Sequence, residues 1–138
     1  MWIRQLAWYW GPVILYAALI FFLSSQSRPS QYLPGFLFGL SDKVLHSFEY
    51  GILAVLLYRA FKYTVRTKWA AGWAIFCAMA YGLLDEIHQW FVPYREVEMF
   101  DFLADSVGAA ILVLTWVFFT EKHKHQTLKQ TSTTDLRE

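Results

Sequence analysis

The chain has 138 residues, of which 57% are hydrophobic, 20% are aromatic and 17% are charged. A chain of this length forms one domain, and its apolar share exceeds the roughly 45–50% of soluble proteins. Disorder is excluded, because disordered chains have low hydrophobicity and few aromatic residues. The single cysteine, Cys77, excludes a disulfide framework and a thiolate metal cluster. Since the net charge of +1 also argues against a nucleic-acid-binding protein, the composition indicates a small, helix-rich membrane protein.

Four stretches are apolar enough to cross a bilayer, which takes about 20 residues of helix. We predict an all-α integral membrane bundle of four transmembrane helices, at about residues 8–23, 44–61, 69–91 and 100–119. The bundle forms one domain, residues 1–119. Residues 120–138 are polar and are expected to form a flexible tail.

The first stretch has a second interpretation, as a secretory signal with Ser25-Gln26-Ser27 as the cleavage site. Its apolar run is longer than the usual ~7–15 residues of a signal, and only Arg4 precedes it. A retained membrane span is therefore the favoured interpretation.

Polar residues interrupt the later stretches at a spacing of three or four, which places them on shared helix faces. In chain order they are Asp42, His46, Glu49 and Tyr50, then Asp85, Glu86, His88 and Gln89, then Asp101 and Asp105. Only eight residues, 92–99, connect the third and fourth spans, so these spans are expected to be antiparallel neighbours. Their polar ends should then meet, with Asp85, His88, Arg95, Asp101 and Asp105 close together.

The basic residues predict the orientation, because they favour the cytoplasmic side of a membrane. Nine of them lie on one side of the predicted spans: Arg4, Arg59, Lys62, Arg66, Lys68, Lys122, Lys124, Lys129 and Arg137. Three lie on the other side: Arg28, Lys43 and Arg95. We therefore expect a multi-pass protein of the cell membrane with both termini in the cytoplasm.

The acidic residues are distributed the opposite way. Eight of the eleven fall on the predicted outer half: Asp42, Glu49, Asp85, Glu86, Glu96, Glu98, Asp101 and Asp105. Acidic residues contribute little to topology, and ionisable residues within spans are costly and mark functional sites by default. The distribution thus predicts an outward-facing acidic site.

The candidate residues divide into two groups. The catalytic candidates are Asp42, His46, Asp85, Glu86, His88 and Asp101, and the ligand-binding candidates are Lys43, Glu49, Tyr50, Gln89, Arg95 and Asp105. Structural interpretations stay open for several of them. Asp42 and Asp101 suit first helical turns, Arg95 suits an ion pair, and His46 suits helix packing.

Such a cluster supports three kinds of chemistry. Histidines among carboxylates suit a divalent cation such as magnesium, calcium or manganese, although the spacing matches no recognised metal motif. A His–Asp pair suits acid–base work on a lipid headgroup, and the carboxylates suit proton or cation binding. A serine nucleophile has little support, because Ser24, Ser25, Ser27 and Ser30 follow the first span without an elbow motif.

The ordered motifs resemble those of the VanZ family of small bacterial membrane proteins. The motifs are Asp42-Lys43-x-x-His46 with Tyr50, then Tyr81-Gly-x-x-Asp85-Glu86-x-x-Gln89-x-Phe91-x-Pro93-x-Arg95, then Asp101-x-x-x-Asp105-x-x-Gly108. The chain departs from the family pattern at Tyr94, where glycine is usual, and at Asp105, where asparagine is also common. The resemblance implies a multi-pass membrane protein whose namesake is linked to resistance to the glycopeptide teicoplanin, and it supplies no chemical mechanism.

Three functions remain open from the sequence. The first is modification or binding of a lipid or a lipid-linked envelope precursor at the outer leaflet. The second is binding or transport of a cation or a small amphiphile. The third is a non-catalytic envelope protein that alters antibiotic access.

Overall fold

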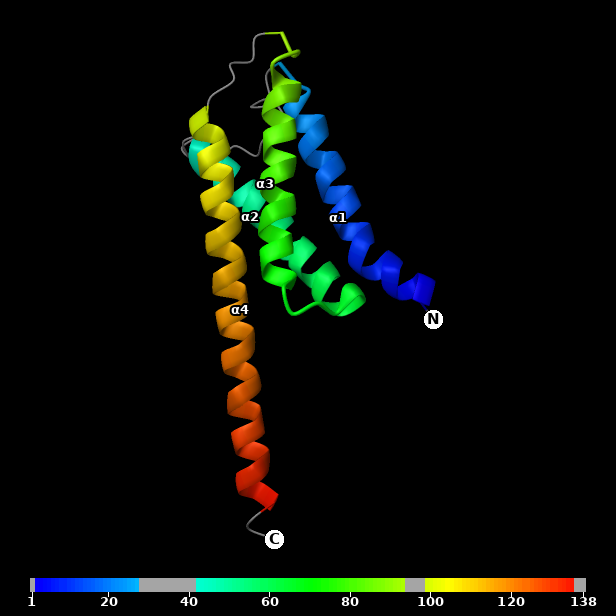
Figure 1. The fold of residues 1–138 in the computed structure, drawn as a ribbon, viewed down its shortest axis with the longest axis vertical. Helices are drawn as coiled ribbons and strands as arrows, with labels where there is room; N and C mark the ends of the chain where they lie inside the picture. Colours follow the sequence, from blue (N-terminus) through cyan, green and yellow to red (C-terminus); the bar gives the residue numbers. More distant parts are fainter. Residues whose placement is uncertain (1, 28–41, 94–98, 136–138) are drawn as a thin grey trace, which may run out of the picture.

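The computed structural model describes residues 2–27, 42–93 and 99–135, and all regular structure within these residues is helical. The helices are α1 (Trp2–Ser24), α2 (Asp42–Ala60), the short π-helix η3 (Phe61–Val65), α3 (Ala70–Gln89) and α4 (Met99–Asp135). Figure 1 shows α1 and α3 running alongside each other and α4 extending well beyond both. The predicted all-α bundle is confirmed.

Four segments are long and apolar enough to cross a membrane: Trp2–Ser24, Val44–Val65, Ala70–Gln89 and Phe102–His123. Large apolar side chains on these segments stay exposed at the surface of the bundle, among them Leu15, Phe76, Leu84, Ile111 and Phe118. A surface of this kind faces lipid rather than water. The chain is therefore a multi-pass membrane protein.

Helix α2 contacts α1, α3 and α4, and its contact with α4 is the most extensive between any two of the described helices. Two glycines make that contact close. A Cβ atom added to Gly108 would overlap the backbone of Ser47, and one added to Gly51 would overlap the side chain of Leu112. Ser47 Oγ also donates a hydrogen bond of 3.0 Å to the carbonyl of Ala104. Small residues at such crossings let helix backbones approach in membranes.

The second predicted span ends in a π-helix that the apolar pattern did not indicate. Arg66 follows it with a positive φ of 55°, and its N–H bonds to the carbonyl of Phe61. Helix α1 holds this segment from the side, since Trp10 Nε1 donates a 3.0 Å hydrogen bond to Thr64 Oγ1. The rings of Tyr9 and Tyr63 stack at 5.1 Å.

The sequence predicted a fourth span that ends near residue 119, with a flexible tail after it. In the structure, helix α4 continues to Asp135. Most of the polar segment that was expected to be flexible is therefore helical. Residues 120–135 contain neither proline nor glycine, so none of the strong helix breakers interrupts this part of the chain.

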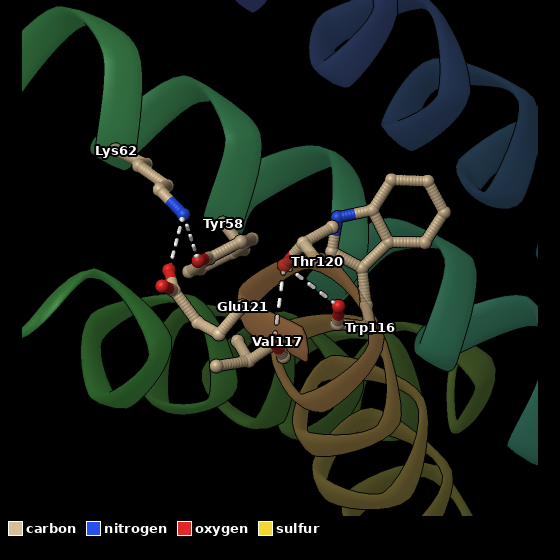
Figure 2. Close-up of polar contacts among 6 residues, drawn as sticks. All are labelled: Tyr58, Lys62, Trp116, Val117, Thr120 and Glu121. Atoms are coloured by element: carbon tan, nitrogen blue, oxygen red, sulfur yellow. Dashed lines mark hydrogen bonds and ion pairs between the residues drawn. The ribbon is translucent and has the colours of Figure 1, made fainter. Parts of the chain in front are cut away.

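A polar link joins η3 and the end of α2 to α4 near the end of the membrane segments. Figure 2 shows Lys62 reaching both partners: its Nζ donates to Tyr58 Oη at 2.8 Å and lies 3.3 Å from Oε1 of Glu121. About half of the Glu121 side chain is exposed. This link lies at the opposite end of the bundle from Asp85 and Asp105.

Candidate functional site

The buried face of α3 changes from small to polar along its length. Ala70, Ala74, Ala78 and Gly82 are buried at intervals of four, and the same face continues with Asp85, Glu86 and Gln89. These last three side chains are at most 6% exposed. Inside the group, Gln89 Nε2 donates a 3.0 Å hydrogen bond to Oδ2 of Asp85. The helix that packs into the bundle through alanines thus ends in a buried polar cluster.

Helix α4 brings a further buried carboxylate to the same level. Asp105 is 1% exposed, and its Oδ1 lies 3.4 Å from Nδ1 of His46 on α2. Gly82 on α3 leaves room for this carboxylate, since a Cβ there would lie 3.1 Å from Oδ2 of Asp105. Three helices therefore meet at Asp105. The short connection between the third and fourth spans predicted the meeting of α3 and α4, but not the part of α2 in it.

Tyr50 lies at the centre of this meeting point. It is 1% exposed, and a Cβ on Gly82 would lie 3.3 Å from its ring. Asp85 from α3 and Asp105 from α4 are both close enough to interact electrostatically with its hydroxyl. We call Asp85, Glu86, Gln89, Asp105, His46 and Tyr50 the acidic cluster.

Glu49, the neighbour of Tyr50, lies on the side of α2 that faces α1 and α3. It interacts electrostatically with Tyr16 of α1 and Tyr81 of α3. Tyr81 in turn donates a 2.7 Å hydrogen bond from its hydroxyl to the carbonyl of Ala17. Glu49 therefore lies within electrostatic range of side chains on both α1 and α3.

His88 contacts a different neighbour from the one that its spacing predicted. Its Nε2 lies 3.0 Å from Oγ of Ser25, just beyond the end of α1. Its ring also lies 4.6 Å from that of Phe21, with 31° between the two planes. In the structure, the contacts of His88 are thus with α1, whereas Asp85 and Asp105 are grouped around Tyr50.

The remaining candidates can be placed only in part. Asp42 and Asp101 lie in the first turns of α2 and α4, and Lys43 follows Asp42, but their side chains are not among those that the structure describes. Arg95 lies outside the described residues. The predicted meeting of Arg95 and Asp101 with Asp85 therefore stays a prediction.

Within residues 2–27, 42–93 and 99–135, no three His, Cys, Asp or Glu side chains are grouped closely enough to hold a metal ion. The sequence suggested a divalent cation among these groups. Asp105 and His46 lie 3.4 Å apart and could together supply two ligands. Calcium typically takes six to eight oxygen ligands.

The sequence interpretation gave Ser25 little support as a nucleophile, because no elbow motif surrounds it, whereas the structure places it beside His88. The signal that points to it is topological: α1 and α3 cross the bundle in the same direction, so their carboxyl ends lie together (Figure 1). A serine directly after the first span is thereby placed beside a histidine near the end of the third.

Together, the four membrane helices and the buried acids at one end define a multi-pass membrane protein with a polar site at one end of its bundle. The family model described as VanZ/LLP1 matches residues 9–120, which include all four apolar segments in whole or in large part. The chain belongs to this family. No curated protein and no solved structure matches it.

Proposed function

We propose that this protein binds the polar headgroup of a lipid or of a lipid-linked envelope precursor in its acidic cluster, on the outer side of the cell membrane. Binding, or modification of the bound group, would then alter susceptibility to glycopeptides. The binding cluster is supported by the structure, and its placement on the outer side is supported by the distribution of basic residues in the sequence. The effect on glycopeptide susceptibility is supported by membership of the VanZ/LLP1 family.

The observation that carries the proposal is the burial of Asp85, Glu86 and Asp105, each at most 6% exposed, in the membrane-spanning part of the chain. A charge at this depth costs several kcal/mol. Asp85 and Glu86 also lie near the carboxyl end of α3, where the helix dipole disfavours negative charge. Packing alone gives no reason to place them there, whereas binding does.

The chemistry of the cluster indicates the kind of group that would fit. Carboxylates accept hydrogen bonds, and Gln89 and Tyr50 add groups that both donate and accept. A ligand rich in hydroxyl or ammonium groups complements such a site, and lipid headgroups and lipid-linked sugars carry these groups.

The pair formed by His46 and Asp105 supports modification as well as binding. A carboxylate at Nδ1 orients an imidazole and stabilises its protonated form, which is the arrangement used in general acid–base catalysis. Modification of the bound headgroup would use this pair.

Transport of a cation or an amphiphile is the alternative, and the polarity of the core disfavours it. Away from the acidic cluster the buried side chains are mostly apolar, including Leu57 on α2, Ala74 on α3 and Val113 on α4. A pathway through a membrane needs polar groups in both halves. The described core therefore supports a site that opens to one side.

The experiment is identification of lipids that remain bound to the full chain purified in mild detergent, by mass spectrometry of the organic extract. We expect wild-type protein to retain one headgroup class and Asp85→Asn to retain it about 10–100-fold less, because a hydrogen bond to a charged group contributes about 1.5–3 kcal/mol. The substitution keeps the side-chain volume.

Glu121→Gln is the matched control, since Glu121 lies at the opposite end of the bundle and is half exposed. Equal retention by all three proteins would overturn the proposal. Metal analysis of the same samples tests the alternative: a stoichiometric cation that Asp85→Asn loses, with no bound lipid, would favour cation binding.

A further inference from the structure

Ser25 and His88 form a second polar group, next to the acidic cluster but contacting α1. Ser25 Oγ donates a 2.6 Å hydrogen bond to the carbonyl of Phe21, and it lies 3.0 Å from Nε2 of His88. Serine carries one hydroxyl proton. A rotation about its Cβ–Oγ bond therefore exchanges the Phe21 carbonyl for His88 as the acceptor.

The surroundings of this pair suit a reaction at the membrane boundary. Ser25 directly follows a membrane-spanning segment that ends at Ser24, and both Ser25 and His88 are partly exposed. The Phe21 ring lies against the imidazole and restricts its orientation. Ser24 is 4% exposed, and its hydroxyl has no hydrogen-bond partner in the described part of the chain.

The membrane-facing surface on one side of the pair is apolar. Leu84 lies one helical turn before His88 and is 63% exposed, while Phe21 and Phe22 on α1 are each about half exposed. An acyl chain lying along this surface would bring its ester group to the boundary, at the level of Ser25. An apolar surface beside a polar pair favours the carboxylic ester of a membrane lipid as the substrate class.

We propose that Ser25 is a nucleophile and His88 its general base, and that together they cleave an acyl ester of a membrane lipid. This proposal does not depend on the acidic cluster. A hydroxyl within hydrogen-bond reach of a histidine is the arrangement by which serine is activated for attack on a carbonyl.

The reaction divides into two steps. Ser25 Oγ bonds to the ester carbonyl carbon as its proton passes to Nε2 of His88. The bond between that carbon and the alcohol oxygen then breaks, and the alcohol leaves with the proton from His88. In the second step a water molecule gives a proton to His88 and attacks the acyl-serine, which releases the carboxylic acid and returns the proton to Ser25.

The test uses the full chain in detergent with a fluorophosphonate, which labels activated serines, and with p-nitrophenyl butyrate as the ester. We expect wild-type protein to carry the phosphonate on Ser25, located by peptide mass spectrometry, and to hydrolyse the ester. Ser25→Ala should do neither. Ser27→Ala, two residues further along and exposed, is the matched control and should behave as wild type.

His88→Gln distinguishes catalysis from a purely structural hydrogen bond between α1 and α3. Glutamine can still bond to Ser25 but cannot act as a base. The labelling and hydrolysis rates should therefore fall by about 100-fold or more, with an unchanged melting temperature. Wild-type protein without a label on Ser25, or His88→Gln labelled as fast as wild type, would overturn the proposal.

Discussion

Gly108 determines how closely α2 and α4 approach each other. An added Cβ would overlap the backbone of Ser47, which has no flexible side-chain end that can move aside. The two helices would have to separate, which would also weaken the hydrogen bond from Ser47 to Ala104.

We therefore predict that Gly108→Ala lowers the free energy of unfolding by about 1–3 kcal/mol or more, the usual cost of overpacking. Denaturation of the purified protein in mixed micelles measures this free energy of unfolding. Gly72→Ala is the matched control, because nothing lies within 4 Å of a Cβ at Gly72. That change should be neutral or stabilising by up to about 1 kcal/mol. Equal destabilisation by both would mean that the α2–α4 crossing is not close.

The different surroundings of His88 and Gln89 show where prediction from the sequence ends. Both lie one turn from Asp85, and adjacent positions on an α-helix differ by about 100° in direction. Gln89 stays with Asp85 in the acidic cluster, whereas His88 contacts α1. Spacing places both residues on the same broad face, but which neighbouring helix each contacts depends on how the helices are rotated in the bundle.

At the scale of the helices, apolar length predicts the spans but not where the helices end. Helix α1 begins at Trp2, because Arg4 and Gln5 interrupt the apolar run without disfavouring helix. The carboxyl-terminal part of α4 is helical for the same reason. The meeting of Asp85 and Asp105 was predictable, because a short connection requires the ends of α3 and α4 to lie together.

The extension of α4 leads to a prediction about truncation. The last membrane-spanning segment ends at His123, and beyond it α4 projects away from the other helices (Figure 1). We expect a chain ending at His123 to insert into membranes and to melt within about 2–4 °C of the full chain, the shift of roughly 0.5 kcal/mol that surface changes cause.

Membrane fractionation and thermal melting in detergent measure this effect. A chain ending at Val113 is the control and should fail, because it removes half of the fourth span. A much lower melting temperature for the His123 truncation would instead show that residues 124–138 stabilise the bundle.

At the scale of the whole molecule, the core is graded from apolar to acidic. Leu57, Ala74 and Val113 are buried in one part of the bundle, and Tyr50, Asp85 and Asp105 are buried towards the other end. The helix directions fix this arrangement within the bundle, because α1 and α3 end where α2 and α4 begin (Figure 1). Which end faces the outside is a separate question, and only the distribution of basic residues in the sequence addresses it.

We predict that a reporter fused within residues 62–68 or after Glu121 is cytoplasmic, and that one inserted at Pro34 is exterior. The reason is the excess of lysine and arginine on the side that includes Lys62, Arg66 and Lys68. Paired reporters, one active only outside the cell and one only inside, measure each position.

A chain in which glutamine replaces Lys62, Arg66 and Lys68 is the control. This replacement should weaken the orientation preference, because it removes positive charge from the cytoplasmic side. If the reporter at residues 62–68 were exterior in the natural sequence, the acidic cluster would open towards the cytoplasm. Its ligand would then have to be sought among cytoplasmic lipids rather than envelope precursors.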